Sequence, residues 1–414
     1  MPIYLLATLD TKGPEAAFIR DRLAELGLST VVVDTGCLGE PIFRADISRA
    51  EIFQAAGTSL ADLVRQNDRG QAVTAAAAGA RKIVAEAHSQ GRLEGIIGLG
   101  GSAGTTISAT AMQALPIGVP KVLISTLASG QVRQYVGDKD ILMLNSIVDI
   151  AGINRVSRQI LGEAAAAIAG MTKFRVPVLA DDKPLVAATM FGVTTPCVQH
   201  ARSILEQAGY EVLVFHATGN GGQAMESLIR DGLISGVLDI TTTELADELV
   251  GGVFSAGPTR LTAAGQASVP QVVSVGALDM VNFREPESVP EKFRSRKFHR
   301  HNPTVTLMRT TPEENARLGE ELAQKVSQSK GLSAIFLPLQ GVSAIDRQGQ
   351  SFDDPAARVA LYDAIRANHG SVELVEMDLH INDPKFAEAC ARKLLELMGK
   401  HEATVGTTAK TKAT

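Results

Sequence analysis

The sequence predicts an α/β protein of two similar lobes, each with a mainly parallel sheet covered by helices, and with a cleft between the lobes. Short apolar runs alternate with amphipathic helical stretches along nearly the whole chain, a pattern typical of parallel sheets. The alternation restarts after about residue 176. The 414 residues also exceed what one hydrophobic core ordinarily holds, which favours two domains.

The elements of the first lobe follow from these runs in chain order. Apolar runs predict strands, and apolar residues three or four positions apart predict helices. The expected elements are strand Ile3–Ala7, helix Pro14–Leu26, strand Thr30–Val33, helix Gln71–His88, strand Glu94–Leu99 and strand Lys121–Ser125.

The second half of the chain repeats stretches of the first half in the same order. All α/β units look alike to some degree, but the shared order and spacing favour an internal duplication of Rossmann-like lobes. We predict a first lobe at residues 1–176, a second lobe at 177–400 and a disordered tail at 401–414. The matching pairs are Tyr4–Thr8 with Leu185–Thr189, Ile19–Gly27 with Ala201–Gly209, Thr30–Val33 with Glu211–Phe215, and Val119–Val122 with Val269–Val272.

Composition predicts a cytoplasmic protein that binds neither nucleic acid nor membranes. The net charge is −5, and the sequence has no long basic block. No apolar run is long enough to cross a bilayer. Cys37, Cys197 and Cys390 lie far apart in the sequence, so we expect free thiols in a reducing compartment.

A glycine-rich loop follows the strand expected at Glu94–Leu99 and precedes a helix-compatible stretch. Glycine lets the backbone approach an anion closely, and the first N–H groups of a helix favour a phosphate. The loop lacks the Gly-Lys-Ser/Thr of a P-loop and lies too deep in the lobe for a dinucleotide fingerprint. A tight turn without a ligand is the alternative. The candidate phosphate-binding residues are Gly98, Gly100, Gly101, Ser102, Gly104, Thr105 and Thr106.

Other polar residues follow neighbouring strands of the first lobe. Lys12 could place a positive charge near phosphate oxygens, Asp10 could bind Mg²⁺ through water, and Asp34 could accept a ribose hydroxyl. The alternatives are a helix cap at Asp10 and Thr11 beside a solvated lysine, and a turn aspartate at position 34. The predicted nucleotide site also includes two residues after a further strand, Ser129 and Gly130.

The second lobe carries titratable residues at its own strand ends. His216 precedes a second glycine loop, Gly219–Gly222, and Glu226 lies one turn into the next helix, while Asp279 follows a later strand. His301 and the histidine two positions earlier would point to one side of a strand and could bind a metal. An anion-binding arm or a polar loop is the alternative there, and a lone histidine is often structural. The candidate catalytic residues are His216, Glu226, Asp279 and His301.

Nine stretches spread over residues 1–400 together resemble one known family. They are Thr8–Gly13, Gly98–Thr106, Ser125–Gly130, Tyr135–Ile141, His216–Glu226, Asp239–Glu244, Ala277–Phe283, His301–Pro303 and Leu337–Gly341. The family is the ATP-binding domain family named after the N-terminal half of a tomato mosaic virus resistance protein, and most members are uncharacterised bacterial proteins. The resemblance implies a two-lobed α/β protein that binds ATP with Mg²⁺ and forms a homo-oligomer. Some members carry an additional barrel domain, so a separate barrel-domain protein could be a partner.

Three functions fit these features. The first is an ATP- and Mg²⁺-dependent enzyme that acts on a small anionic metabolite, a carboxylate or a phosphate, in the cleft. The second is a non-catalytic module that engages a protein partner in response to ATP. The third, a nicotinamide-dependent enzyme, is disfavoured by the position of the glycine loop. The number of His, Asp and Glu residues at second-lobe strand ends favours the enzyme.

Overall fold

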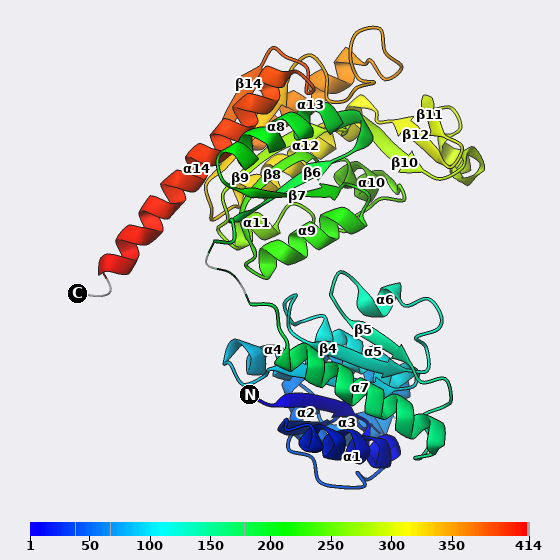
Figure 1. The fold of residues 1–414 in the computed structure, drawn as a ribbon. Coiled ribbons are helices and arrows are strands. Elements are labelled where there is room, and N and C mark those ends of the chain that lie inside the picture. The colour runs from blue at the N-terminus through cyan, green and yellow to red at the C-terminus, as the bar shows by residue number, and fades with distance from the viewer. Residues whose placement is uncertain (38, 67, 178, 180, 412–414) are drawn as a thin grey trace. The chain divides into compact units, whose positions relative to one another are not determined.

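The computed structural model describes residues 1–37, 39–66, 68–177, 179 and 181–411. It consists of two compact lobes, Met1–Val178 and Leu179–Thr414, so the boundary falls close to the one expected after residue 176. The prediction of two α/β lobes with mainly parallel sheets of Rossmann-like type is confirmed (Figure 1).

The first lobe has a five-stranded parallel sheet in the order β2-β1-β3-β4-β5. Leu5 of β1 pairs with Val32 of β2 on one side and with Ile97 of β3 on the other. The strand order therefore reverses between β1 and β3, and ligands of such sheets bind beyond the carboxyl ends of the strands at the reversal. The strands are β1 (Ile3–Ala7), β2 (Thr30–Asp34), β3 (Gly95–Gly100), β4 (Lys121–Ser125) and β5 (Leu142–Asn145).

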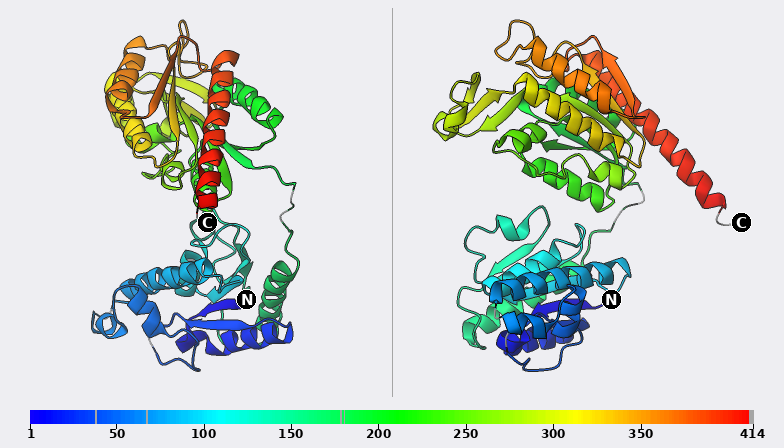
Figure 2. Two further views of the ribbon diagram at one scale, coloured as in Figure 1. Left: turned by 90° about the vertical axis from the view of Figure 1, so that its left-hand side faces the viewer. Right: turned by 180° about the vertical axis from the view of Figure 1, so that it is seen from behind.

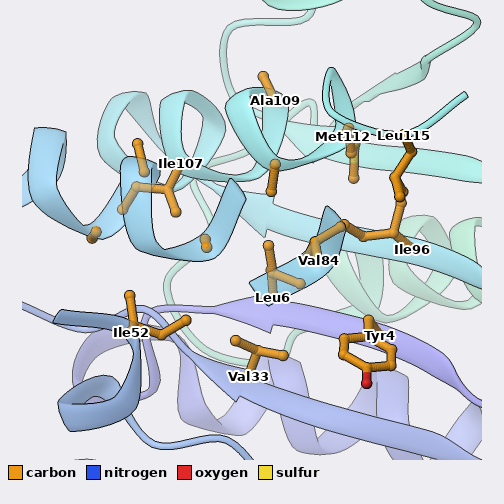
Figure 3. Close-up of a cluster of buried hydrophobic side chains, with 14 of the residues drawn as sticks. Tyr4, Leu6, Val33, Ile52, Val84, Ile96, Ile107, Ala109, Met112 and Leu115 are labelled. Carbon is orange, nitrogen blue, oxygen red and sulfur yellow. The ribbon is translucent and has the colours of Figure 1, made fainter. Parts of the chain in front are cut away.

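Helices cover both faces of this sheet. Tyr4 and Leu6 pack against one helical layer, and their neighbours Ile3 and Leu5 pack against the other. Figure 3 shows the first of these cores, in which sheet side chains meet those of the covering helices. The helices are α1 (Leu9–Glu25) and α7 (Arg155–Lys173) on one face, α2 (Arg49–Ala55), α4 (Arg69–Ser89) and α5 (Ser102–Met112) on the other, and the short α3 (Leu60–Gln66) and α6 (Arg133–Val136).

Local sequence determines where these helices begin. Ser48 and Glu51 form a capping box at α2, Asp68 accepts a backbone N–H at the start of α4, and Asn154 does the same at α7. Helix α5 differs, because its N-cap residue is Gly101. A glycine has no side chain with which to bond the first N–H groups of the helix.

The second lobe has a six-stranded parallel sheet in the order β14-β13-β9-β8-β6-β7. Taken in chain order, its first five strands are connected as in the first lobe, with the first strand between the second and the third. This shared connectivity agrees with the sequence repeat, which pairs β6, β7 and β9 with β1, β2 and β4. The strands are β6 (Leu185–Met190), β7 (Glu211–His216), β8 (Ile234–Thr241), β9 (Gln271–Gly276), β13 (Ser333–Pro338) and β14 (Glu373–Met377), with a separate antiparallel sheet of β10 (Met280–Phe283), β12 (Val305–Arg309) and β11 (Phe298–Asn302).

Two helices pack on one face of the six-stranded sheet and the others lie on the opposite face (Figure 2). The first two are α8 (Thr195–Gln207) and α14 (Pro384–Thr411), and the others are α9 (Asn220–Arg230), α10 (Glu244–Val250), α11 (Ala263–Gln266), α12 (Pro312–Ser327) and α13 (Pro355–Asn368). The sequence predicts a disordered tail at residues 401–414. Helix α14 extends to Thr411, so the described residues of that segment, 401–411, are helical. Throughout the described ranges, no helix combines the length and the apolar character needed to cross a membrane.

Candidate functional site

A pocket of about 220 Å³ opens at the carboxyl ends of β1 and β3, where the strand order of the first lobe reverses. We call it the β1/β3 pocket. Open α/β sheets bind ligands at this position, and predicted residues from both strand ends meet there. Its lining residues are Thr8, Asp10, Thr11 and Lys12 after β1, Cys37 after β2, Arg69 and Val73 of α4, and Gly101, Ser102, Ala103, Gly104 and Ile107 after β3.

The chain bends as it enters α1. Lys12 has a φ of −125° and a ψ of 23°, which interrupts the helix one turn after it begins. Thr11 N and Lys12 N both donate to Thr8 O, at 3.0 and 2.7 Å. This turn places all three residues in the lining of the pocket. The Lys12 ammonium also donates to the Ile150 carbonyl. Asp10 Oδ2 accepts from a backbone N–H of the loop after β2 at 3.1 Å.

Three glycines allow α5 to lie close to β3. A Cβ at Gly98 would collide with a serine of α5, one at Gly100 would lie 2.6 Å from Gly104 Cα, and one at Gly104 would lie 2.8 Å from a carbonyl of β3. A Cβ at Gly101 would have more room, because its nearest described contact outside the chain neighbours would be Thr126 Oγ1 at 3.8 Å. No side chain of the described chain caps α5 at this residue. The first N–H groups of α5 therefore open onto the pocket.

The two threonines of the loop hold α5 in place. Thr105 is buried, and its Oγ1 lies 2.7 Å from Ser125 Oγ at the end of β4. Thr106 Oγ1 donates to Ser102 O, one turn earlier, at 2.9 Å. The hydroxyl groups that the sequence analysis assigned to phosphate binding thus form bonds within the lobe.

Asp34, expected to accept a ribose hydroxyl, is buried beside the pocket. Its Oδ1 accepts from Leu9 N at 3.1 Å and from Gly36 N at 2.8 Å, so the carboxylate joins the loops after β1 and β2. Burial raises its pKa, and these two bonds oppose the rise. These contacts agree with the alternative interpretation of Asp34 as a residue that stabilises a turn, rather than with a ribose-binding role. Ser129 and Gly130 lie exposed in the turn after β4.

The described lining of the β1/β3 pocket carries two cations, Lys12 and Arg69, and one carboxylate, Asp10. Burial, together with the charges of two nearby aspartates, raises the pKa of Cys37 to about 11. Its thiol is therefore protonated at neutral pH and is a poor nucleophile. Arg69 was not predicted from the sequence, because two short helices separate it from the preceding strand. The pocket suits a bound anion better than covalent chemistry.

A larger groove of about 560 Å³ lies between α1 and α7. Acids and bases alternate along its walls, among them Asp21, Arg22, Glu25 and Arg158. It lies on a helical face of the sheet, and its described lining includes none of the residues predicted to bind a ligand. The strand-end position and the open N-terminus of α5 make the smaller pocket the candidate site.

The second glycine loop already holds a carboxylate. Glu244 is buried, and its Oε1 accepts from Gly219 N at 2.7 Å and from Gly222 N at 3.0 Å. The loop therefore binds an anion, as its glycines predict, but the anion belongs to the same chain. By strand order, moreover, the counterpart of the first-lobe glycine loop is the segment after β8, whereas Gly219–Gly222 follows β7.

Arg260 connects Glu244 to two further buried carboxylates. Its Nε donates to Glu244 Oε2 at 2.6 Å, and Nη1 and Nη2 donate to Asp239 Oδ2 and Oδ1 at 2.5 and 2.7 Å. Glu226 is a catalytic candidate, and its Oε1 lies 3.6 Å from Arg260 Nη1. Its carboxylate also accepts hydrogen bonds from two backbone N–H groups near the start of α11, at 2.6 and 2.8 Å. The Glu226 carboxylate is thus committed to contacts inside the lobe. No sequence motif marked Arg260.

Asp279, another catalytic candidate, is fully buried after β9. Its Oδ2 accepts from Ser343 Oγ at 2.8 Å, and its Oδ1 has no hydrogen-bond partner among the described residues. Burial and the charge of Asp346 raise its pKa to about 7, and Arg309 opposes the rise. The carboxyl group can hold a proton near neutral pH, but it is closed off from solvent.

The two candidate histidines lie on different elements. His216 is exposed at the end of β7, with its ring 5.4 Å from that of Phe191, and partial burial lowers its pKa. His301 belongs to β11, and its side chain lies outside the described residues. In the part of the chain that the structure describes, no group of three or more His, Cys, Asp or Glu side chains could hold a metal ion.

Comparison with known proteins places the chain in a family. The N-terminal domain of the uncharacterised protein family UPF0261 matches residues 1–177, and its C-terminal domain matches residues 183–398. A UPF0261 protein of Clostridium tetani is 51% identical over 400 residues, which are 96% of this chain and 99% of that protein. A relative in Rhizobium meliloti is 45% identical over 392 residues, 94% of this chain and 96% of that protein.

Two tomato proteins are also relatives, which confirms the resemblance to the family named after the tomato mosaic virus resistance protein. The ToMV susceptible protein tm-1(GCR26) of Solanum lycopersicum is 44% identical over 424 residues, which cover 96% of this chain but 56% of the tomato protein. Among solved structures, the alignment with an S. aureus MnaA-UDP co-structure spans 91% of this chain and 100% of that chain, at 11% sequence identity and a TM-score of 0.21. This similarity is too weak to indicate a shared function. This chain therefore belongs to the uncharacterised protein family UPF0261.

Proposed function

We propose that the first lobe binds ATP with Mg²⁺ through the phosphate chain in the β1/β3 pocket. The observation that carries this proposal is the open N-terminus of α5 at the reversal of strand order. Helix N–H groups without a capping side chain favour a phosphate. Lys12 and Arg69 would add positive charge from two other elements.

The charges and size of the pocket also fit this ligand. Asp10 is the carboxylate of the described lining, and it would hold Mg²⁺ through water. A bound Mg²⁺ would neutralise part of the phosphate charge. Pockets for whole drug-sized ligands measure roughly 300–1,000 Å³, so one of about 220 Å³ would enclose the phosphates and leave the nucleoside near solvent.

Two functions would use the bound ATP differently. An enzyme that acts on a small carboxylate or phosphate, with His216 and His301 as acid–base groups, stays a prediction. The burial of Glu226 and Asp279 within the second lobe favours the other function, a non-catalytic module that engages a protein partner in response to ATP. A homo-oligomer, a separate barrel-domain partner and a cytoplasmic location also stay predictions.

Calorimetric titration with MgATP tests the site. Gly101 has an extended backbone, with a φ of −76° and a ψ of −153°, and a Cβ there would lie 3.8 Å from its nearest described contact, so we expect Gly101→Val to fold while placing two methyl groups at the open end of α5. We expect affinity to fall about tenfold or more, because charged hydrogen bonds to the phosphate are lost. Gly162→Val, in the larger groove, is the matched control, since a Cβ there meets no described atom within 4 Å.

The two variants separate the possible locations. Unchanged affinity in Gly101→Val would place the nucleotide elsewhere, and a loss in Gly162→Val alone would favour the groove between α1 and α7. ATP turnover in the presence of small acids separates the two functions. Turnover that His216→Ala abolishes would support the enzyme, and ATP-dependent capture of a partner without turnover would support the module.

A further inference from the structure

The loop between β5 and α7, residues 146–154, has a strained backbone. Ile147 has a φ of 61°, in the left-handed region that a β-branched residue rarely adopts, and it is 71% exposed. A small void of about 10 Å³ lies beneath the loop, next to Ile150. Such a backbone persists only where surrounding contacts hold it. We call this segment the β5–α7 loop.

Two residues near the start of α1 provide contacts of this kind. The Lys12 ammonium donates to Ile150 O, and Gly152 N donates to Glu15 Oε1 at 2.6 Å. Glu15 is fully buried. Lys12 also lines the β1/β3 pocket. One residue, Lys12, therefore both bonds the loop and lines the candidate ligand site.

We propose that the β5–α7 loop responds to the ligand: a phosphate in the β1/β3 pocket orders the loop through Lys12, and the loop orients Lys12 for the phosphate. This inference rests on the proposed function of the pocket. An ammonium has three donors, so bonds to Ile150 O and to a phosphate oxygen can exist together. The entropy of fixing the lysine is then lost once for both contacts, which makes loop order and ligand binding favour each other.

Glu15 is a positioning residue in this arrangement. It lies outside the described lining of the pocket, but it anchors Gly152 two residues after the carbonyl that holds Lys12. Loss of its carboxylate would loosen residues 150–152. Because coupling is reciprocal, ATP affinity would then fall even though no group that touches the ligand has changed.

Hydrogen exchange of the full chain tests the coupling with four samples: protein alone, with MgATP, with inorganic tripolyphosphate and with adenosine. We expect exchange in residues 146–154 to slow with the two phosphate-bearing ligands and to stay unchanged with adenosine. Strand β8 is the internal control. If both phosphates bind and exchange in the loop does not change, the coupling is wrong and the proposed site stands. If neither binds, the proposed function fails and the coupling fails with it.

Three variants test the connection through Lys12. In ligand-free Lys12→Met, loop exchange should rise about fivefold, the effect of losing one hydrogen bond. Glu15→Ala should raise it similarly and weaken ATP binding, whereas Glu15→Gln, which keeps an acceptor oxygen, should restore both. Wild-type exchange in β1, β3 and β4 shows that a variant is folded. Unchanged loop exchange in Lys12→Met, or unchanged ATP affinity in Glu15→Ala, would overturn the coupling.

Discussion

Asp247, in the second lobe, is a buried carboxyl group whose charge is unfavourable at neutral pH. Its Oδ1 accepts from Asn282 N at 2.9 Å, and its Oδ2 accepts from Asn282 Nδ2 at 2.6 Å. Burial raises its pKa from 3.8 to about 7, and the bonds to Asn282 oppose the rise. The unfolded chain releases this proton at lower pH than the folded chain does. Stability should therefore decrease as pH rises from about 4 to about 7.

Asp247→Asn removes this pH-dependent loss. The variant should gain more stability at pH 8 than at pH 5, by roughly 1–3 kcal/mol in the free energy of unfolding. The new amide needs an acceptor, and Asn282 Oδ1, which has no partner among the described residues, would supply it if the Asn282 side chain turned over. Urea denaturation at both pH values measures the difference. Asp363→Asn, at an exposed aspartate of the same lobe, is the control, and an equal gain at both pH values would contradict the explanation.

The positions of several candidate-site residues were easier to predict from the sequence than their roles. Strand ends are visible in the sequence, and the structure brings Asp10, Lys12 and Gly101 from two of them into one pocket. Glu226 and Asp279 have the same local signal. Their partners, including Arg260, come from elsewhere in the chain, and only tertiary structure shows that these carboxylates are buried and bonded.

The elements expected in the first lobe are present in the structure, but the 19-residue helix α7 and several short elements were not among them. The strands expected at Ile3–Ala7 and Lys121–Ser125 coincide with β1 and β4, and the strand expected at Glu94–Leu99 differs from β3 by one residue at each end. Strand β5 has four residues, and the apolar run that overlaps it, Ile141–Leu144, is too short to predict a strand. The seven-residue helices α2 and α3 were missed for the same reason.

The contact between α5 and β3 depends on its glycines. Gly98→Ala should lower the stability of the first lobe by about 1–3 kcal/mol, because the new methyl group would push against Ser108 of α5. Gly162→Ala, at an open position of α7, should be neutral or stabilise by up to about 1 kcal/mol. Thermal denaturation compares the two variants. Wild-type stability in Gly98→Ala would show that α5 can move away from the sheet at little cost.

At the scale of the whole molecule, the ligand should stabilise the two lobes unequally. A ligand that binds only the folded first lobe adds about 2.7 kcal/mol to its stability at a concentration 100 times its Kd. The second lobe fills its own glycine loop with Glu244, so we expect no direct gain there. Hydrogen exchange of β1–β4 and of β6–β9, with and without MgATP, measures each lobe separately. Protection centred on β6–β9 would move the nucleotide site to the second lobe.

The two-lobed organisation was predictable because the repeat is present in the sequence itself. Matching stretches lie on β1 and β6, on β2 and β7, and on β4 and β9, so the shared strand order follows the shared sequence. The antiparallel sheet β10-β12-β11 and the sixth strand β14 have no counterpart in the first lobe. No repeat could reveal them, so fewer elements of the second lobe were predictable from the sequence.

The position of β1 between β2 and β3 also constrains the order in which the first lobe can fold. Leu5 pairs with Val32 nearby in the chain and with Ile97 much further along it. Pairings that close long stretches of chain carry a higher entropic cost and tend to form late. The pocket needs both β1 and the start of α5, so a chain emerging from the ribosome cannot bind a phosphate there until this late pairing is made. The ligand can preserve a finished lobe, but it cannot guide the first steps of its folding.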